Sequence, residues 1–416
     1  MKSQFLIAAP TSGSGKTTVA RGLMALLTKK GYQVQPFKCG PDYIDTKFHE
    51  AVCHRPSVNL DTFMATPEHV RQLFTHYGAD ADVCIVEGMM GLFDGYDRDK
   101  GASAEVAKVL DIPIILVVDA KSAAYSIAAL LSGFIHFKED IRIAGVIFNK
   151  VGSPKHFQML QQVCDDLDIQ CFGYLPKHSA LEQGSRYLGL DFSQSPETIQ
   201  LLELLERHVN WEELIVSLRA QNSNSQYILP HRNISHVLIA RNAESFSFLY
   251  QETIDSFQYV QFFDPECDVP SLDGIDLLYL PGGYPEKHLD ALADNEACRK
   301  VIKAYADKGG QVIAECGGMM YLCQSIVTDD DRAYPMCGVL PYSITARQAD
   351  RKLSLGYRRF ILDGKEYRGH EFHYTQFLGE TPKSVVQVYN AKGEPVNTPV
   401  FKYNNVLASY THLYQI

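Results

Sequence analysis

The sequence predicts an α/β protein with two doubly wound domains. Short apolar runs alternate with stretches of helical spacing in the first half of the chain, and the alternation restarts at residue 235. Strands separated by helices in this way form a mainly parallel sheet with helices on both faces. The expected domains are residues 1–219 and 233–416. Residues 220–232 are expected to be a linker, because Ala220–Gln226 is polar and Pro230 follows.

The bulk composition excludes several classes of protein. The 416 residues carry a net charge of −10, which gives no electrostatic support to a nucleic-acid partner. No apolar run approaches the roughly 20 residues that cross a bilayer, and Lys16 interrupts the only N-terminal apolar stretch, so no signal peptide is expected. The ten cysteines have no C-x-x-C or zinc spacing, which indicates reduced thiols. We therefore expect a cytoplasmic enzyme.

The opening stretch has the pattern of a phosphate-binding loop. An apolar run from Phe5 to Ala9 is expected to be a buried strand, and a loop of small residues leads from it into a helix. Backbone N–H groups of such a loop converge on phosphate oxygens. Lys16 would lie along the outer phosphates and the Thr17 hydroxyl would complete a Mg²⁺ shell. Pro10 replaces the first glycine of the usual pattern, and the alternative is a chance loop, which the Lys-Thr pair at the junction disfavours. The residues expected to bind nucleotide here are Ser12, Gly13, Ser14, Gly15, Lys16, Thr17 and Thr18.

Carboxylates follow the next two expected strands. The strand Gly31–Lys38 ends in a loop with Asp42 and Asp45, and loops at the carboxyl ends of parallel strands converge on the ligand. A solvated turn is the alternative for these two acids. The strand Val83–Val86 runs into Glu87, as in a Walker B motif, where a buried strand delivers an acid to the metal. The expected Mg²⁺ ligands are Thr17, Asp45 and Glu87. Asp94 lies in a glycine-flanked loop, where a substrate contact and a plain surface turn are equally supported.

Three further strands are expected in the first domain, over Ile112–Val118, Ile143–Phe148 and Cys171–Pro176. The second is followed by Asn149, whose amide can read a nucleotide base. Gly152 stands where GTP-specific sites carry an aspartate, so ATP is the expected nucleotide.

The second half contains the pattern of a cysteine nucleophile. A strand over Gln311–Glu315 turns sharply at Cys316 into two glycines and an apolar helix, like the strand–nucleophile–helix elbow of hydrolases. We expect the helix N-terminus to lower the pKa of the thiol. Another expected strand, Ile275–Leu280, leads into Pro281–Pro285, whose glycines leave N–H groups open to an oxyanion. The oxyanion hole is expected at Gly283 and Gly317.

A thiol nucleophile needs a base, and three histidines are candidates. His370 and His373 lie in one segment, and His412 follows a short expected strand near the end of the domain. Position favours His412, since a returning loop there could reach the elbow. His370 and His373 are expected to bind substrate or to have a structural role.

The motifs occur together in the order of a known family, and the chain resembles the cobyrinic acid a,c-diamide synthases over nearly its whole length. The matching segments are APTSGSGKTT, KCGPDYID, VEGMMGLFDG, PGGYPE, AECGGMMYL, RGHEFHY and ASYTHL. The first half is similar to dethiobiotin-synthetase-type P-loop ATPases, and the second half to class I glutamine amidotransferase domains.

The resemblance implies ATP-dependent amidation of the a and c side-chain carboxylates of a corrinoid precursor, with glutamine as nitrogen donor. It implies that Cys316 is the nucleophile and that His412 activates it. The residues implied at the synthetase site are Asp42, Tyr43, Asp45, Glu87 and Asp94. Typical glutamine amidotransferases carry a Glu two residues after the catalytic His, whereas here Tyr414 occupies that position. Either another group orients the imidazole or glutaminase turnover is slower.

The expected partners are small molecules, namely a tetrapyrrole acid, ATP and glutamine, without nucleic acid or membrane; a homodimer is compatible with them. The expected mechanism passes through an acyl phosphate. Hydrogenobyrinic acid and nickel-sirohydrochlorin are alternative acceptors. Alternatives of another class are a non-catalytic ATP-dependent switch protein and a cysteine hydrolase with a vestigial ATP site.

Overall fold

The computed structural model describes residues 2–178, 196–220, 227, 229 and 232–414. The chain divides into two compact units, Met1–Leu229 and Pro230–Ile416. Most of the linker expected at residues 220–232 lies outside the described residues.

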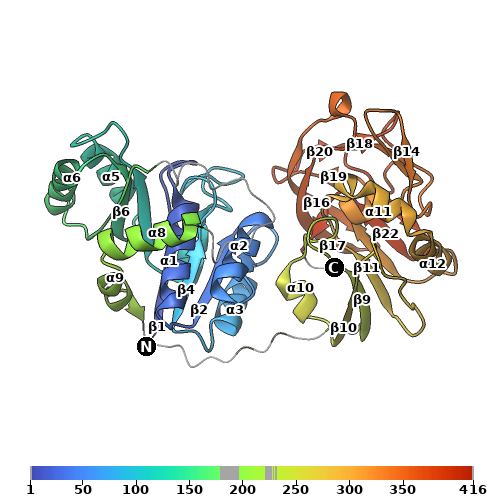
Figure 1. Ribbon diagram of the computed structural model, residues 1–416, viewed down its shortest axis with the longest axis horizontal. Helices are drawn as coiled ribbons and strands as arrows, with labels where there is room; N and C mark the ends of the chain where they lie inside the picture. The colour runs from blue at the N-terminus through green and yellow to red at the C-terminus, as the bar shows by residue number, and fades with distance from the viewer. Residues whose placement is uncertain (1, 179–195, 221–226, 228, 230–231, 415–416) are drawn as a thin grey trace. The chain divides into compact units, whose positions relative to one another are not determined.

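The first unit is built around one mainly parallel sheet (Figure 1). Its strands run in the order β3-β2-β4-β1-β5-β6-β7, and β8 pairs antiparallel with the start of β1. The elements are β1 (Lys2–Ala8), α1 (Lys16–Lys29), β2 (Val34–Cys39), α2 (Ile44–Cys53), β3 (Val58–Leu60), α3 (Pro67–Tyr77), β4 (Val83–Glu87), α4 (Ser103–Leu110), β5 (Ile114–Asp119), α5 (Ile127–His136), β6 (Ile143–Val151), α6 (Pro154–Asp166), β7 (Cys171–Pro176), α8 (Pro196–His208), α9 (Trp211–Ser217) and β8 (Arg219–Ala220).

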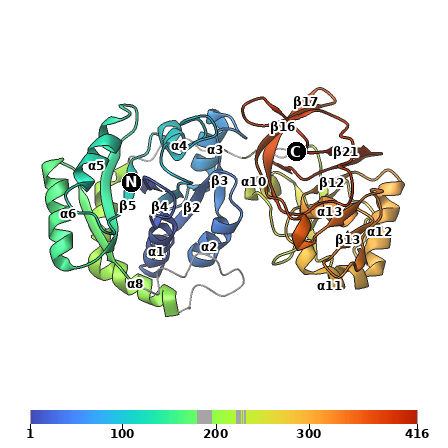
Figure 2. The same cartoon turned by 90° about the horizontal axis from the view of Figure 1, so that it is seen from above.

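Helices cover both faces of this sheet. Figure 2 shows α1 and α2 on one face and α3 and α4 on the other, and the members of each pair contact one another. Helix α1 faces the sheet because its apolar residues recur at helical spacing, so that Val19, Leu23 and Leu27 are fully buried against β1. The doubly wound prediction for this half is confirmed.

The register of the sheet brings three strand ends together. Residue Glu87 at the end of β4 pairs with Lys38 on β2 and with Ile7 on β1. The loops that follow these strands therefore start at one edge of the sheet, where doubly wound proteins bind their ligands.

The second unit combines a mainly parallel sheet with two smaller sheets. The larger sheet has the order β10-β9-β11-β12-β22-β21, and only β21 runs antiparallel to its neighbour; the smaller sheets have the orders β14-β13-β15-β18 and β20-β19-β16-β17-β23. The elements are β9 (His236–Ala240), α10 (Gln251–Asp255), β10 (Tyr259–Phe263), β11 (Leu277–Leu280), η1 (Pro285–Lys287), α11 (Leu289–Asp294), α12 (Glu296–Asp307), β12 (Val312–Glu315), α13 (Gly317–Leu322), β13 (Ser325–Val327), β14 (Ala333–Pro335), β15 (Ser343–Thr345), η2 (Gln348–Asp350), β16 (Ser354–Leu362), β17 (Lys365–His373), β18 (Gln376–Phe377), β19 (Val388–Tyr389), β20 (Pro395–Val396), β21 (Val400–Tyr403), β22 (Val406–Ser409) and β23 (His412–Leu413).

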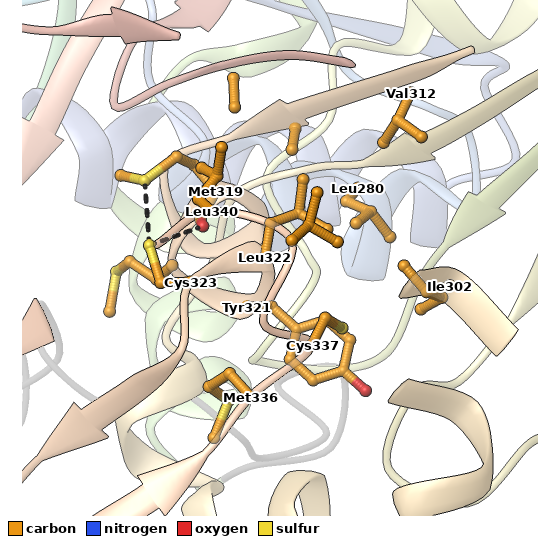
Figure 3. Close-up of a cluster of buried hydrophobic side chains, with 14 of the residues drawn as sticks. Leu280, Ile302, Val312, Met319, Tyr321, Leu322, Cys323, Met336, Cys337 and Leu340 are labelled. Atoms are coloured by element: carbon orange, nitrogen blue, oxygen red, sulfur yellow. Dashed lines mark hydrogen bonds between the residues drawn. The ribbon is translucent and has the colours of Figure 1, made fainter. Parts of the chain in front are cut away.

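Helix α13 lies in the main core of the second unit (Figure 3). Met319, Tyr321 and Leu322 are fully buried among side chains of β11, β12 and α12, such as Leu280, Val312 and Ile302. An added Cβ on Gly318 would lie 2.0 Å from the Leu280 carbonyl, so glycine allows the helix to approach β11 closely. The core therefore fixes the residues that follow position 316.

Several elements were not predicted from the sequence. These include α2 and β3 in the first unit and, in the second, β10 and β21 of the larger sheet and most strands of the two smaller sheets. All ten cysteines are free thiols, as expected. Over the residues that the structure describes, no helix combines the length and apolar character needed to cross a membrane.

Candidate functional sites

The loop between β1 and α1 has the backbone form of a phosphate cradle. Gly13 and Gly15 adopt left-handed conformations, with φ of +80° and +94°, which residues with side chains rarely adopt. The buried Ser14 hydroxyl donates to the Thr11 carbonyl at 2.8 Å, so the loop is held by its own hydrogen bonds. Ser12 is exposed, while Thr18 is half-buried in the first turn of α1. Open N–H groups at the start of a helix attract anions, so this loop is suited to phosphate.

Asn149 on β6 is hydrogen-bonded to the backbone of the cradle. Its Nδ2 donates to the Ser14 carbonyl at 3.0 Å, and its Oδ1 accepts from the Lys150 N–H at 2.9 Å. A Cβ on Gly15 would lie 1.9 Å from this Nδ2, so the close approach requires glycine. The oxygen and the nitrogen of the Asn149 amide are thus both hydrogen-bonded within the protein. Recognition of the nucleotide base by Asn149 stays a prediction.

Glu87 is the centre of a buried network beside the cradle. The Thr17 hydroxyl donates to Oε1 at 2.6 Å, the Lys38 ammonium donates to the same oxygen at 3.2 Å, and His49 Nε2 lies 2.7 Å from Oε2. Burial alone would raise the pKa of Glu87, but Lys38, His49 and Thr17 together hold that pKa well below its usual range. The carboxylate is therefore ionised at neutral pH.

Lys38 joins this network to the loop after β2. Its Nζ lies 2.7 Å from Asp45 Oδ2 and 3.9 Å from Asp42 Oδ2, and it donates to the Gly88 carbonyl at 3.1 Å. Burial would lower the pKa of Lys38, but the surrounding carboxylates raise it above its usual value. Burial and the neighbouring Glu87 charge raise the pKa of Asp45 to about 6.

Lys16 points toward the loop that follows Glu87. Its Nζ donates to the Met90 carbonyl at 3.0 Å. Burial, and then the nearby Lys38 charge, lower the pKa of Lys16 to about 8. The ammonium thus contacts a backbone carbonyl rather than a carboxylate, which leaves it available to a phosphate oxygen at neutral pH.

The oxygen atoms near Thr17 fit Mg²⁺ held jointly with phosphate. The Thr17 hydroxyl and the carboxylates of Glu87 and Asp45 are hard donors of the kind that Mg²⁺ prefers. Within the described residues, no group of three or more His, Cys, Asp or Glu side chains could hold a metal on its own. Mg²⁺ usually takes one or two carboxylates and completes its shell with water and substrate phosphates, so the donor set fits that mode.

The other predicted synthetase residues have structural partners close to themselves in sequence. Asp42 Oδ1 accepts from the N–H groups of Ile44 at 2.8 Å and of Asp45 at 3.0 Å, at the start of α2. Tyr43 is buried. Asp94 is exposed, and its Oδ2 accepts from the Gly91 N–H at 3.1 Å, within its own loop. The structure thus gathers Asp42 and Asp45 around Lys38, whereas Asp94 shapes the loop after Glu87.

Sequence reasoning missed Lys38 and His49. Lys38 pairs with Glu87 in the parallel register of β2 and β4, so the rule that strand ends converge could have found it. His49 lies four residues after Asp45 on α2 and faces the same network, but α2 itself was not predicted.

Cys316 occupies a strained elbow in the second unit. It joins β12 to α13 with φ of 46° and ψ of −107°, a conformation that is costly for a residue with a side chain. Its N–H donates to the Ser409 carbonyl at 2.8 Å, which ties the elbow to β22. The predicted strand–nucleophile–helix arrangement is therefore present.

His412 and Cys316 both lie beside Gly282. A Cβ added to Gly282 would lie 2.1 Å from His412 Cε1 and 3.2 Å from Cys316 Cβ. The ring and the nucleophile therefore face the same side of Gly282. The Phe248 ring also packs near the imidazole, with centroids 6.0 Å apart.

The two glycines predicted for the oxyanion hole lie together beside the thiol. A Cβ on Gly317 would lie 3.0 Å from both the N and the O of Gly283. Gly283 itself has φ of +156° and passes so close to the Glu244 and Ser245 carbonyls that a Cβ would clash with both.

The prediction of a lowered thiol pKa is wrong. Burial, and then the Glu286 charge, raise the pKa of the Cys316 thiol, and the Gly317 N–H only partly opposes them. Burial, and then His370 and His373, lower the pKa of His412 to about 3. The short helix cannot outweigh desolvation, so the pair consists of a neutral thiol and a neutral imidazole in the absence of substrate.

The residues that could orient His412 differ from the usual pattern. Tyr414 is buried, and its hydroxyl donates to Glu252 at 2.8 Å. His370 is paired directly with His412 across β17 and β23. His373 lies 2.7 Å from Glu371 and stacks on Tyr410 with ring centroids 3.6 Å apart.

Comparisons with known proteins agree with both units. Residues 5–188 match the model of the CobQ/CobB/MinD/ParA nucleotide binding domain, and residues 240–415 match that of the CobB/CobQ-like glutamine amidotransferase domain.

Curated relatives match over nearly the whole chain. A cobyrinate a,c-diamide synthase of Caldanaerobacter subterraneus subsp. tengcongensis is 36% identical, covering 98% of this chain and 94% of the relative. A hydrogenobyrinate a,c-diamide synthase of Brucella anthropi is 37% identical, covering 98% of both chains. A cobyrinate a,c-diamide synthase of Listeria innocua is 36% identical, covering 99% of this chain and 96% of the relative. These relatives are named as synthases, which does not favour the alternative of a non-catalytic switch. The chain therefore belongs to the cobyrinic acid a,c-diamide synthase family, and it is a carbon–nitrogen ligase with a nucleotide-binding domain and a glutamine amidotransferase domain.

Proposed function

We propose that the protein amidates the a and c side-chain carboxylates of cobyrinate, with ATP activating each carboxylate and glutamine supplying the nitrogen. The observation that carries the proposal is the pairing, in one chain with a,c-diamide synthase relatives, of a phosphate cradle and a thiol–imidazole site. Either site alone would fit many enzymes. A reaction that consumes a nucleotide and releases ammonia needs both.

The first unit would activate the acceptor. A carboxylate is a poor electrophile, because its charge repels nucleophiles and oxide is a poor leaving group. Transfer of the γ-phosphoryl group to a carboxylate oxygen would give an acyl phosphate and ADP, and attack by ammonia on the acyl carbon would then release phosphate. Lys16 and the N–H groups of the cradle would stabilise the charge that develops on the phosphoryl oxygens. The nucleotide site would comprise Ser12, Gly13, Ser14, Gly15, Lys16, Thr17, Thr18 and Asn149.

Mg²⁺ would be held by Thr17, Glu87 and Asp45 together with the phosphates. When bound, it would act as a Lewis acid on phosphate oxygens. Lys38 and His49 would keep Glu87 ionised and fixed toward Thr17, in support of that role. Asp42, Tyr43 and Asp94 would contact the acceptor at the edge of this site.

The second unit would release ammonia from glutamine. As the Cys316 sulfur attacks the amide carbon, His412 would take the thiol proton, and the N–H groups of Gly283 and Gly317 would donate to the oxyanion. The imidazolium would return the proton to the leaving nitrogen, so that ammonia departs and a thioester remains. Water would then hydrolyse the thioester, releasing glutamate and restoring the thiol. A neutral Cys316 thiol and a neutral His412 imidazole suit this series of steps, because the thiolate need form only when glutamine is present.

Hydrogenobyrinate is a second candidate acceptor. Relatives named hydrogenobyrinate a,c-diamide synthase are as similar to this chain as those named for cobyrinate, at 37% and 36% identity. The two acceptors differ in the central metal.

A panel of acceptors tests the proposal. The protein is incubated with ATP, Mg²⁺ and glutamine and with cobyrinate, hydrogenobyrinate or nickel-sirohydrochlorin, and products are identified by mass. We expect two amides on cobyrinate, with ADP and glutamate formed in step. Two amides on hydrogenobyrinate at a higher kcat/KM would transfer the assignment to that acceptor. Glutamate release without amidation of any acceptor would refute the synthetase proposal.

A further inference from the structure

Glu315 is a buried carboxyl that the mechanism above does not use. It is the last residue of β12 and directly precedes Cys316. Its Oε1 accepts from the Leu413 N–H at 3.0 Å, and its Oε2 accepts from the Tyr279 hydroxyl at 2.9 Å. The side chain therefore connects β12 to β23 and to β11.

The bond to Leu413 joins two different sheets. Strand β12 belongs to the larger sheet, whereas β23 pairs with β17 in one of the smaller sheets. The amide that Glu315 holds belongs to the residue immediately after His412. One side chain thus links the backbone beside the nucleophile to the backbone beside the base.

The residue at position 414 explains why a link between Glu315 and the backbone beside His412 would matter. In this chain the residue two positions after His412 directs its hydroxyl to Glu252, so it does not play the part of the glutamate that usually follows the catalytic histidine. Glu315 holds the backbone of β23 directly after His412 and joins it to the elbow, so it contributes to where the imidazole lies.

We infer that Glu315 is a positioning residue of the glutaminase site, which sets the place of His412 relative to Cys316 through the Leu413 amide. The inference rests on the proposed glutaminase activity. A displacement of about 1 Å between reacting groups can lower a rate about 100-fold, so a link of this kind has a measurable kinetic effect.

Glutamine is the matched replacement for this carboxyl. Burial raises the pKa of Glu315 to about 8, so the carboxyl is mainly neutral at pH 7. In Glu315→Gln the amide oxygen can accept from Leu413 and the NH2 group can donate to the Tyr279 oxygen. Glu315→Met keeps the length without the acceptor, and Glu315→Asp keeps the carboxyl but is one methylene too short.

The test compares these three variants at pH 7. We expect Met and Asp to lower the kcat of glutamate release about 100-fold while the KM for glutamine changes less than about threefold, and Gln to stay within about threefold of the unmodified protein. Amidation with ammonium chloride should persist in all three, because it needs only the first unit. Asn405→Ala is the control. The Asn405 side-chain amide donates to the Gly309 carbonyl at the end of the β12–β22 pair that is farther from Cys316, so loss of this hydrogen bond should leave kcat unchanged.

The outcomes separate the inference from the function on which it rests. Absence of glutamate release in the unmodified protein would overturn the proposed function. Normal release in the unmodified protein together with normal kcat in Glu315→Asp or Glu315→Met would overturn the positioning role alone. If Glu315→Met does not fold, the kcat values of Glu315→Gln and Glu315→Asp decide between the two roles. A positioning role predicts the higher kcat for Glu315→Gln, whereas a role of the charge alone predicts the higher kcat for Glu315→Asp.

Discussion

At the scale of single residues, Lys38 has the greatest influence on the first site. Its ammonium is buried and lies among the carboxylates of Asp45, Glu87 and Asp42. Three negative groups so close together would repel one another without it. The lysine therefore stabilises the arrangement of acids that the proposed metal site requires.

Replacing Lys38 with methionine should destabilise the first unit and abolish synthesis. Loss of one partner of a buried ion pair leaves an uncompensated charge, which costs about 3–5 kcal/mol of unfolding free energy. Urea denaturation measures the stability, and amidation with ammonium chloride measures the activity. Lys100→Met is the matched control, since Lys100 forms an exposed pair with Asp97, and it should leave stability nearly unchanged. Equal stability of the two variants would contradict the role given to Lys38.

His412 should make the stability of the protein depend on pH. Burial lowers its pKa to about 3 in the folded protein, whereas an unfolded histidine titrates near 6.5. Between these values the unfolded state binds more protons than the folded state, so the unfolding free energy rises with pH. The contribution of His412 to stability is complete above pH 6.5 and is lost as the pH falls toward 3. The contribution is at most ~1.4 kcal/mol per pH unit. Thermal or urea denaturation of His412→Asn across this range should show a shallower slope, and the exposed His236→Asn should show the original one.

At the scale of elements, the loop after β11 limits the space that the base and the nucleophile share. Gly282 leaves just enough room for the His412 ring and the Cys316 side chain on one side of it. In Gly282→Ala the new methyl group would lie 2.1 Å from His412 Cε1, so the ring must move. We expect glutamate release to fall about 100-fold while ammonia-supported amidation persists.

Gly274→Ala is the control for that substitution. Gly274 has φ of +75° but open space where a Cβ would lie, so alanine there adds backbone strain without a clash. It should lower stability slightly and leave glutamate release unchanged. An equal loss of glutamate release in both variants would point to general loosening of the unit rather than to displacement of the imidazole.

The elements that carry chemistry were predictable from the sequence because each is a short apolar strand that ends in a reactive residue. Glu87 at the end of β4 and Cys316 directly after β12 are examples. Helix α2 was not predicted, since the Gly40-Pro41-Asp42 segment signals a turn and hides the helix that begins at Ile44, and His49 was missed with it. The raised thiol pKa was not predicted either, because burial depends on packing from distant segments such as β17 and β22, which local sequence does not specify.

At the scale of the whole molecule, the two units contain separate and complete sets of groups. The cradle, Lys38 and Glu87 lie within the first unit, and Cys316, His412 and the two glycines lie within the second. The two half-reactions should therefore be separable by single substitutions.

Two complementary variants test this separation in the full chain. Cys316→Ala removes the sulfur, so glutamine-supported amidation should vanish while ammonium chloride supports amidation at close to the original rate. Lys16→Ala removes the phosphate ligand, so amidation should fall at least about 100-fold with either nitrogen source, while glutamate release continues. The measurements are product mass with each nitrogen source and glutamate release in the absence of acceptor. Loss of ammonia-supported amidation in a folded Cys316→Ala protein would mean that the thiol also serves the synthetase site, and the division of the two half-reactions between the units would be wrong.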